Sequence, residues 1–395
     1  MKSFLRIFMK KIKVAISQRI IPHYRIPVFS ELASRESIDL TLYYGRGFKT
    51  GSQVNAKLMT GFNAKKLFTV MLNYNGVYGG SQLRVWHPFL FFHFIFENYD
   101  VIIVEPSSNF YNNIFTFLYC KIFKKKFIWH ESGSVPKEER PKFRKMIDPL
   151  LSIFIKGSDA FLTYTSYADH SLKRDFNIDS KKIFRAQNSV DTSNIDSEIE
   201  KFSPYVESKK KELGLIGFNV AMYIGGIETR KKIDNLIKAV TKLNKSSIPT
   251  KALIVGDGPD KEKLIQKLSA EEKAHTVFAG KHVKDATLYV LLSDVVVLPS
   301  SGGLSVMTAF ACKKPFIGSE EIEHGGIKDY VEDGTNGYLI KENDIEDLEL
   351  KLMNVFSDPI LYKELCNNAY QTSKKITVSN MVNGYENAIK YAQNL

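Results

Sequence analysis

Residues 220–232 read VAMYIGGIETRKK, an apolar run that ends in two glycines and leads into three consecutive cationic residues. Two later segments repeat the apolar run and its glycines: 252–259 reads ALIVGDGP, and 295–304 reads VVVLPSSGGL. Short apolar runs bounded by Gly or Pro, with helix-like stretches between them, are typical of the βαβ units of a parallel sheet. The three segments therefore predict strands whose glycine-rich loops meet at one edge of a sheet.

The same rhythm extends over most of the chain and predicts two doubly wound α/β domains. The 395 residues are too many for one ordinary core and suit two domains of similar size. We predict a first domain over 1–190, a polar linker region over 191–214, and a second domain over 215–395 that ends in helices. The predicted strands are Lys13–Ser17, Leu40–Tyr44, Val101–Glu105, Phe127–Trp129, Phe161–Tyr164, Ile183–Gln187, Val220–Ile224, Ala252–Val255, Thr276–Ala279, Val295–Leu298, Pro315–Gly318 and Tyr338–Ile340.

Charge is divided unevenly along the chain. Residues 1–188 hold 29 Lys and Arg against 14 Asp and Glu, whereas the remainder is slightly acidic and the total is +12. The basic half shows no zinc-finger, RRM or KH signature, so we predict no nucleic-acid partner. The cysteines Cys120, Cys312 and Cys366 lack CxxC spacing, which excludes a disulfide scaffold or cysteine-rich zinc site and favours a reducing compartment.

Two aromatic runs lie in the basic half: WHPFLFFHFIF at 86–96 and FYNNIFTFLYCKIFKKKF at 110–127. Neither offers the roughly 20 predominantly apolar residues that a membrane-spanning helix needs. Two interpretations remain open. Aromatic side chains beside Lys124, Lys125 and Lys126 favour a surface that docks on anionic headgroups. A buried helix with a solvated basic end explains the same residues.

The loops that follow the second-domain strands are candidate anion sites. Gly225 and Gly226 allow close backbone approach next to Arg230 and Lys231, which suits a phosphate, although a helix entry with ordinary surface lysines would look similar. The glycines of 299–304 open a predicted helix, where unpaired N–H groups form the positive end of the dipole. These loops predict an anion site that suits a phosphate.

In their order along the chain, these loops resemble the donor-binding domain of the retaining glycosyltransferases of family 4. In the first half, 22–27 (PHYRIP), 158–160 (SDA) and 188–191 (NSVD) add to the resemblance. The resemblance implies a GT-B architecture, with two Rossmann-like domains facing a cleft, and a nucleotide sugar as co-substrate. It implies no further cofactor and no metal, because the basic loop takes the place of a cation and no Asp-x-Asp triplet occurs in the candidate loops.

Family roles carry over position by position. Lys231 matches the lysine that neutralises the donor diphosphate, while Gly226 stands where the family usually has an arginine, which Arg230 could replace. Ser300 and Thr308 occupy the positions of the two glutamates that hold the donor sugar and ribose, so the grip on the donor is altered. The donor-binding residues predicted in this way are Gly225, Gly226, Arg230, Lys231, Gly256, Gly280, Val283, Ser300, Gly303, Leu304 and Thr308.

Three first-domain residues complete the candidate site. His130 resembles the family's histidine that faces the donor and is the predicted catalytic residue; a capping or core-packing role is the alternative. Tyr24 and Arg25 follow the first strand and would bind the acceptor, with Arg25 pairing with a phosphate. The alternative is that Tyr24 packs and Arg25 is solvated.

The sequence thus predicts a hexosyltransferase, implied by resemblance to be retaining, that builds a surface polysaccharide or lipopolysaccharide. Its acceptor would be a saccharide or a lipid-pyrophosphate-linked saccharide. We expect it in the cytoplasm, peripheral on the inner face of the cell membrane, with the anionic membrane surface as a partner. Two alternatives are a nucleotide-sugar 2-epimerase, which shares the two-domain architecture, and a non-catalytic partner in a polysaccharide assembly complex, which the missing glutamates favour.

Overall fold

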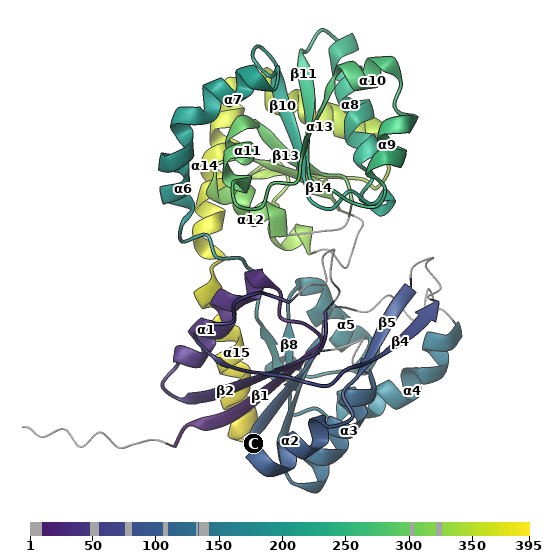
Figure 1. The fold of residues 1–395 in the computed structure, drawn as a ribbon, viewed down its shortest axis with the longest axis vertical. Coiled ribbons are helices and arrows are strands. Elements are labelled where there is room, and N and C mark those ends of the chain that lie inside the picture. Colours follow the sequence, from purple (N-terminus) through teal and green to yellow (C-terminus); the bar gives the residue numbers. More distant parts are fainter. Residues whose placement is uncertain are drawn as a thin grey trace, which may run out of the picture. The chain divides into compact units, whose positions relative to one another are not determined.

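The computed structural model describes residues 10–47, 55–75, 81–105, 110–131, 133, 142–300, 304–320 and 326–395. The chain forms two compact units, one of Met1–Asn188 with Val378–Leu395 and the other of Ser189–Thr377. Each unit is a parallel sheet covered by helices on both faces (Figure 1). The predicted fold class is confirmed, and each predicted strand corresponds to one strand of the structure.

The sheet of the first unit has the order β3-β2-β1-β6-β7-β8-β9, with all neighbours parallel. Its central strands are nearly continuous apolar runs because both faces are buried. The strands are β1 (Ile12–Gln18), β2 (Ile38–Tyr44), β3 (Asn63–Lys66), β6 (Val101–Val104), β7 (Lys126–Glu131), β8 (Ala160–Thr163) and β9 (Ile183–Arg185).

Alternate residues of these strands lie on opposite faces of the sheet and contribute to two separate hydrophobic cores. Ile103 packs with α1 (Ile26–Ser34) and α15 (Val378–Gln393), whereas Ile102 packs on the opposite face. That opposite face is covered by α2 (Leu90–Glu97), α3 (Phe110–Ile122), α4 (Lys142–Lys156) and α5 (Ser166–Phe176).

Three strands were not predicted. The edge strand β3 is polar, reading NAKK, so it lacks the apolar signal of a buried strand. β4 (Val70–Asn75) and β5 (Ser81–Trp86) pair antiparallel as a separate two-stranded sheet in the first unit.

The sheet of the second unit has the order β12-β11-β10-β13-β14-β15, and all its strands are parallel. Its strands are β10 (Asn219–Ile224), β11 (Thr250–Val255), β12 (Thr276–Gly280), β13 (Val295–Leu298), β14 (Phe316–Ser319) and β15 (Gly337–Ile340). Its helices are α6 (Ile195–Phe202), α7 (Val206–Glu212), α8 (Ile233–Lys245), α9 (Lys261–Lys267), α10 (Ala270–Ala274), α11 (Ala286–Leu292), α12 (Leu304–Ala311), α13 (Ile345–Ser357) and α14 (Pro359–Lys375).

The unit boundaries differ from the predicted domains in two ways. The predicted linker 191–214 is largely helical, in α6 and α7, and belongs to the second unit. The terminal helix α15 belongs to the first unit rather than the second, because its buried Met381, Tyr385 and Ile389 join the core beneath α1. It packs so closely that a Cβ at Gly384 would lie 2.4 Å from the carbonyl oxygen of Arg185 in β9.

Candidate functional site

Three of the predicted donor-binding glycines meet at the carboxyl edge of the second sheet. The amide of Gly225 donates to the carbonyl of Val255 (3.0 Å), and the amide of Gly256 donates to the carbonyl of Gly280 (2.7 Å). A Cβ at Gly256 would lie 1.9 Å from the carbonyl oxygen of Gly225, so only glycine allows this approach. The loops after β10, β11 and β12 are thereby held side by side, as predicted.

A short cationic turn follows the first glycine pair. The 3₁₀ turn Thr229–Lys231 carries an exposed Arg230, whose Nε donates to Glu228 Oε2 at 2.6 Å, and a half-buried Lys231. Burial and the neighbouring charge of Arg230 lower the pKa of Lys231. An anion beside this turn would stabilise the protonated ammonium group that burial disfavours.

Two side chains hold this turn through hydrogen bonds. Asp260 accepts from the amide of Thr229 (2.7 Å) and from its hydroxyl (2.9 Å), and these bonds lower the pKa of the carboxyl group. Ser300 lies beyond the end of β13, is 3% exposed, and donates its hydroxyl to the carbonyl of Arg230 at 2.5 Å. Where the resemblance implied a sugar ligand, this hydroxyl already bonds to the turn that carries Lys231.

Asp260 was not among the predicted residues. Its only sequence signal is its place directly after Gly256-Asp257-Gly258-Pro259, in a loop that follows a strand. No local sequence pattern predicts a carboxylate that hydrogen-bonds to a distant loop, and the partner of Asp260, Thr229, lies 31 residues away.

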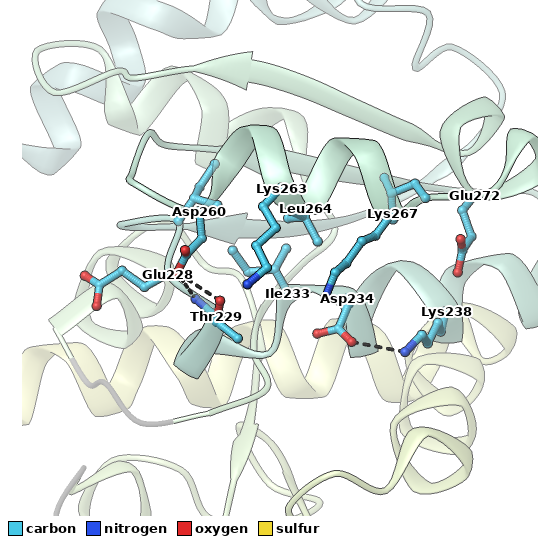
Figure 2. A pocket seen from close by; sticks show the side chains of 12 residues that line it. Glu228, Thr229, Ile233, Asp234, Lys238, Asp260, Lys263, Leu264, Lys267 and Glu272 are labelled. Carbon is cyan, nitrogen blue, oxygen red and sulfur yellow. Dashed lines mark hydrogen bonds and ion pairs between the residues drawn. The ribbon is translucent and has the colours of Figure 1, made fainter. Parts of the chain in front are cut away.

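A cavity of about 260 Å³ opens beside this turn, between α8 and α9 (Figure 2). Asp260 and Thr229 line one end, and Asp234 with Lys238 (3.0 Å) lines the other. Carboxylates and ammonium groups both line the wall, so the cavity lacks the net positive charge that suits a diphosphate. None of the predicted donor-binding residues lines it.

The remaining predicted residues of the second unit are more dispersed. Val283 is 62% exposed, in the loop after β12. Leu304 begins α12 and Thr308 lies one turn further, and both are half-buried. Gly303 lies outside the described residues.

The three predicted residues of the first unit do come together. The Arg25 guanidinium lies 5.5 Å from the ring of Tyr24 and 4.5 Å from the ring of Tyr164, which in turn meets His130 edge-on at 4.0 Å. Arg25 is 6% exposed, so the interpretation of a solvated arginine is wrong. Tyr164 and its hydroxyl partner Tyr385 (3.2 Å) were not among the predicted residues. Tyr385 comes from α15, and no local sequence pattern links that helix to this cluster.

Arg25 is a buried cation with few polar contacts. Its hydrogen bond runs from Nη1 to Met381 Sδ at 3.1 Å, and among the described residues no carboxylate oxygen lies within 4 Å of its nitrogens. Burial raises the pKa of the nearby Glu105. A buried guanidinium without an ion-pair partner is costly, and an anionic ligand would offset that cost.

His130 is 4% exposed at the end of β7, and its Nε2 has no hydrogen-bond partner within the described ranges. Burial and then the charge of Arg25 lower its pKa to about 3. The imidazole is therefore neutral at physiological pH, so it can offer a hydrogen bond but not a positive charge.

His130 is expected to make the protein less stable in acid. Because its pKa is about 3 in the folded state and about 6.5 in an unfolded chain, the unfolded state binds more protons between these values. Its contribution to stability is therefore complete above pH 6.5 and declines as the pH falls toward 3. We expect His130→Gln to flatten the pH dependence of the free energy of unfolding, by up to about 1.4 kcal/mol per pH unit, in urea titrations below about pH 6.5.

The exposed His170 of α5 provides the control for that measurement. His170→Gln makes the same substitution at an exposed position of the same unit. If the free energy of unfolding changed with pH in the same way in the wild type and in His130→Gln, the assignment of a neutral His130 in the folded state would be wrong.

Comparison with known proteins adds the family. Residues 206–372, most of the second unit, match the model of the family described as glycosyl transferases group 1. Over these residues the second unit is similar to the group 1 glycosyltransferases. The matching stretch contains the cationic turn, all three paired glycine loops and both anchors of the turn, Asp260 and Ser300.

Individual relatives match this chain over part of their length. An alpha-monoglucosyldiacylglycerol synthase from Acholeplasma laidlawii is 30% identical over 180 residues, which is 44% of each chain. A poly(ribitol-phosphate) alpha-N-acetylglucosaminyltransferase from Staphylococcus aureus is 27% identical over 154 residues, 37% of this chain and 30% of that protein. The chain thus spans less than half the length of these curated relatives.

The likeness in three dimensions extends over both units. The crystal structure of Anabaena Alr3699/HepE in complex with UDP covers 96% of this chain and 98% of its own, with a TM-score of 0.71 and 14% identity. At this identity the likeness concerns the fold. It agrees with the predicted class of two Rossmann-like α/β domains, of the GT-B type.

Proposed function

We propose that the protein transfers a hexose, with retention at the anomeric carbon, from a nucleotide sugar to a saccharide or lipid-linked saccharide of a surface polysaccharide or lipopolysaccharide. The observation that carries the proposal is the family match over 206–372 together with the glycine loops and Lys231 at one sheet edge. The UDP in the HepE complex, the monoglucosyldiacylglycerol that names one relative and the poly(ribitol-phosphate) that names the other support this substrate class.

The proposed chemistry needs little from the protein beyond charge and orientation. The bond between the anomeric carbon and the donor diphosphate breaks, and an acceptor hydroxyl attacks the oxocarbenium-like sugar and passes its proton to an oxygen of the departing diphosphate. Lys231, Arg230 and the amides of the glycine loops would stabilise the negative charge that develops on the departing diphosphate. Neutral His130 would hydrogen-bond the reacting sugar.

The acceptor side of the proposal rests on Arg25. Its buried guanidinium lies among Tyr24, Tyr164 and Tyr385, and burial raises the pKa of Tyr164 and Tyr385, so these hydroxyls stay neutral. A phosphate group would supply the negative charge that this cluster lacks. We therefore propose that the acceptor is phosphorylated, as a lipid-pyrophosphate-linked saccharide is.

A donor panel tests the proposed function. The purified protein is titrated calorimetrically with UDP-, GDP- and dTDP-sugars, and sugar release is then measured with and without a polyprenyl-pyrophosphate saccharide. Binding with acceptor-dependent transfer supports the proposal. Conversion of UDP-GlcNAc without an acceptor would show an epimerase instead, and binding of none of the sugars would favour a non-catalytic partner, consistent with the engaged hydroxyl of Ser300.

We also propose that the protein lies on the inner, cytoplasmic face of the cell membrane. In the described residues, no helix is both long and apolar enough to cross a bilayer. Instead, α2, α3 and α4 cover one face of the first sheet, and their outward sides are apolar. We call the following exposed residues the aromatic face: Phe89, Phe92, Ile95, Phe96, Tyr111, Phe115, Leu118, Ile122, Met146, Leu150 and Ile153.

Some residues of the two aromatic runs are buried, as the buried-helix interpretation predicts, and others are exposed, as a membrane-docking surface requires. Phe94 and Phe117 are buried against the sheet, whereas Phe96 is 79% exposed and Ile122 71% exposed. Helices that expose this much apolar surface call for a partner. Lys121, Lys124 and Lys125 at the end of α3 favour an anionic membrane.

Reversing these charges should release the protein from anionic vesicles. The combined change Lys121→Glu, Lys124→Glu and Lys125→Glu is expected to weaken binding to phosphatidylglycerol vesicles by about a hundredfold or more, because each basic residue near the surface contributes about 1 kcal/mol. Vesicle sedimentation measures the effect. The same reversal at Lys238, Lys245 and Lys267 of the second unit is the control, and equal losses in both variants would contradict the assigned surface.

A further inference from the structure

A second cavity, of about 310 Å³, opens in the first unit between α2 and α3. It is about twice the size of an engineered cavity of roughly 150 Å³ that admits benzene, so a chain of about a dozen carbon atoms would fill it. Its lining shares Phe92 and Phe115 with the aromatic face. The lining residues are Trp86, His87, Pro88, Leu90, Phe91, Phe92, Phe94, Asn112, Phe115 and Thr116.

Asn112 and Thr116 in this lining already bond to the backbone, whereas the buried Nε2 of His87 has no hydrogen-bond partner among the described residues. The side chain of Asn112 accepts from the amide of His87 (2.7 Å) and donates to the carbonyl of Val85 (3.2 Å). Thr116 donates its hydroxyl to the carbonyl of Asn112 at 2.7 Å. Sugars and nucleotides need several polar partners, which is more than the described side chains of this wall leave available.

The described lining of the cavity is uncharged. None of its described residues is Lys, Arg, Asp or Glu, and burial lowers the pKa of His87, which keeps the imidazole neutral. His87 Nδ1 lies 3.2 Å from the carbonyl oxygen of Phe68, so this nitrogen carries the proton and donates. A neutral apolar interior suits hydrocarbon.

The surroundings of the cavity have the opposite character. Lysines lie at the far end of α3, at the exposed Lys121, and in the turn that follows it, at the exposed Lys124 and the half-buried Lys125. The cationic groups lie on the surface and the uncharged cavity lies inside, which matches the two ends of an anionic lipid. This charge pattern identifies the occupant.

We propose that this cavity binds one hydrocarbon chain of an anionic membrane lipid, drawn from the bilayer on which the aromatic face rests. The inference deepens the proposed membrane association and depends on it. The chain fills the space between α2 and α3, while its phosphate stays outside with the lysines. The protein then attaches to the membrane in two ways: the cavity binds one lipid chain per protein molecule, and the aromatic face makes general apolar contact.

A matched pair of variants separates the cavity from the face. Phe92 and Phe96 lie one turn apart on the outward side of α2 and are 52% and 79% exposed, but only Phe92 lines the cavity. Phe92→Asp places a carboxylate in the cavity wall, and Phe96→Asp makes the same change beside it. Both positions are exposed, so neither substitution should prevent folding, which thermal melting verifies.

The soluble probe is dodecanol with a terminal bromine atom, which quenches tryptophan fluorescence on contact. Trp86 lines the cavity, whereas Trp129, the second tryptophan of the chain, is buried in the core. We expect saturable quenching in the wild type and none in Trp86→Phe. Phe92→Asp should weaken the apparent affinity by about tenfold or more, and Phe96→Asp by less than about twofold.

Equal effects of Phe92→Asp and Phe96→Asp, or quenching that never saturates, would overturn the inference. Absence of quenching together with self-association in sedimentation would assign the aromatic face to a second copy, and would also overturn it. In the vesicle arm, phosphatidylglycerol with brominated acyl chains replaces the alcohol, and quenching of Trp86 supports the inference. Sugar transfer without probe binding refutes only the lipid site, whereas probe binding without sugar transfer refutes only the glycosyltransferase proposal.

Discussion

The Lys231→Ala variant is expected to bind its nucleotide sugar about ten- to a hundredfold more weakly than the wild type. A hydrogen bond between a charged group and its partner contributes about 1.5–3 kcal/mol, and the half-buried position of Lys231 limits screening by water. The glycine amides beside it are neutral and cannot replace its charge. Transfer should fall by at least the same factor, because the departing diphosphate carries more negative charge than the bound donor.

Calorimetry with the sugar nucleotide found in the donor panel measures this change. Lys238→Ala is the matched control, because Lys238 lies in α8 of the same unit and pairs with Asp234 instead of facing the glycine edge. Its dissociation constant should match that of the wild type. An unchanged value for Lys231→Ala would show that the diphosphate binds elsewhere.

Loss of the His130 imidazole should act on catalysis and not on donor affinity. Removing one preorganised hydrogen-bonding group from a site of developing charge typically lowers kcat by about a hundredfold to a thousandfold, and we expect this range for His130→Ala. The donor dissociation constant should stay within about twofold, because the residues assigned to donor binding belong to the other unit. With a pKa of about 3, His130 should add no titration to the kcat profile near neutral pH.

Rapid-quench assays at saturating donor separate these two quantities. His170→Ala removes an exposed histidine of the same unit and should leave kcat unchanged. A kcat of His130→Ala close to that of the wild type, with a lowered melting temperature, would establish the packing role that the sequence left open.

The sheets could be predicted because buried parallel strands leave a strong local signal. Each of the central strands is an apolar run between turn residues, as in Val101–Val104 and Val295–Leu298. β3 leaves no such signal, because a polar strand at a sheet edge satisfies its side chains with water. The hairpin β4–β5 lies outside the βαβ rhythm on which the prediction relied.

The candidate site was predictable to the extent that strand ends define it. Gly225, Gly256 and Gly280 follow three parallel strands, so their meeting follows from topology alone. Contacts between distant segments could not be inferred in this way. The sequence placed Ser300 in the site by resemblance, but its bond to Arg230 depends on how two loops cross.

The buried position of the last helix has a consequence for biosynthesis. Met381, Tyr385 and Ile389 complete the core of the unit that begins the chain, so the second unit is inserted between two segments of the first. A ribosome that has released only the first 190 or so residues has not yet made the helix that covers one face of their sheet. Final consolidation of the amino-terminal unit must therefore wait for the carboxyl terminus, and the inserted unit can complete its own folding before then.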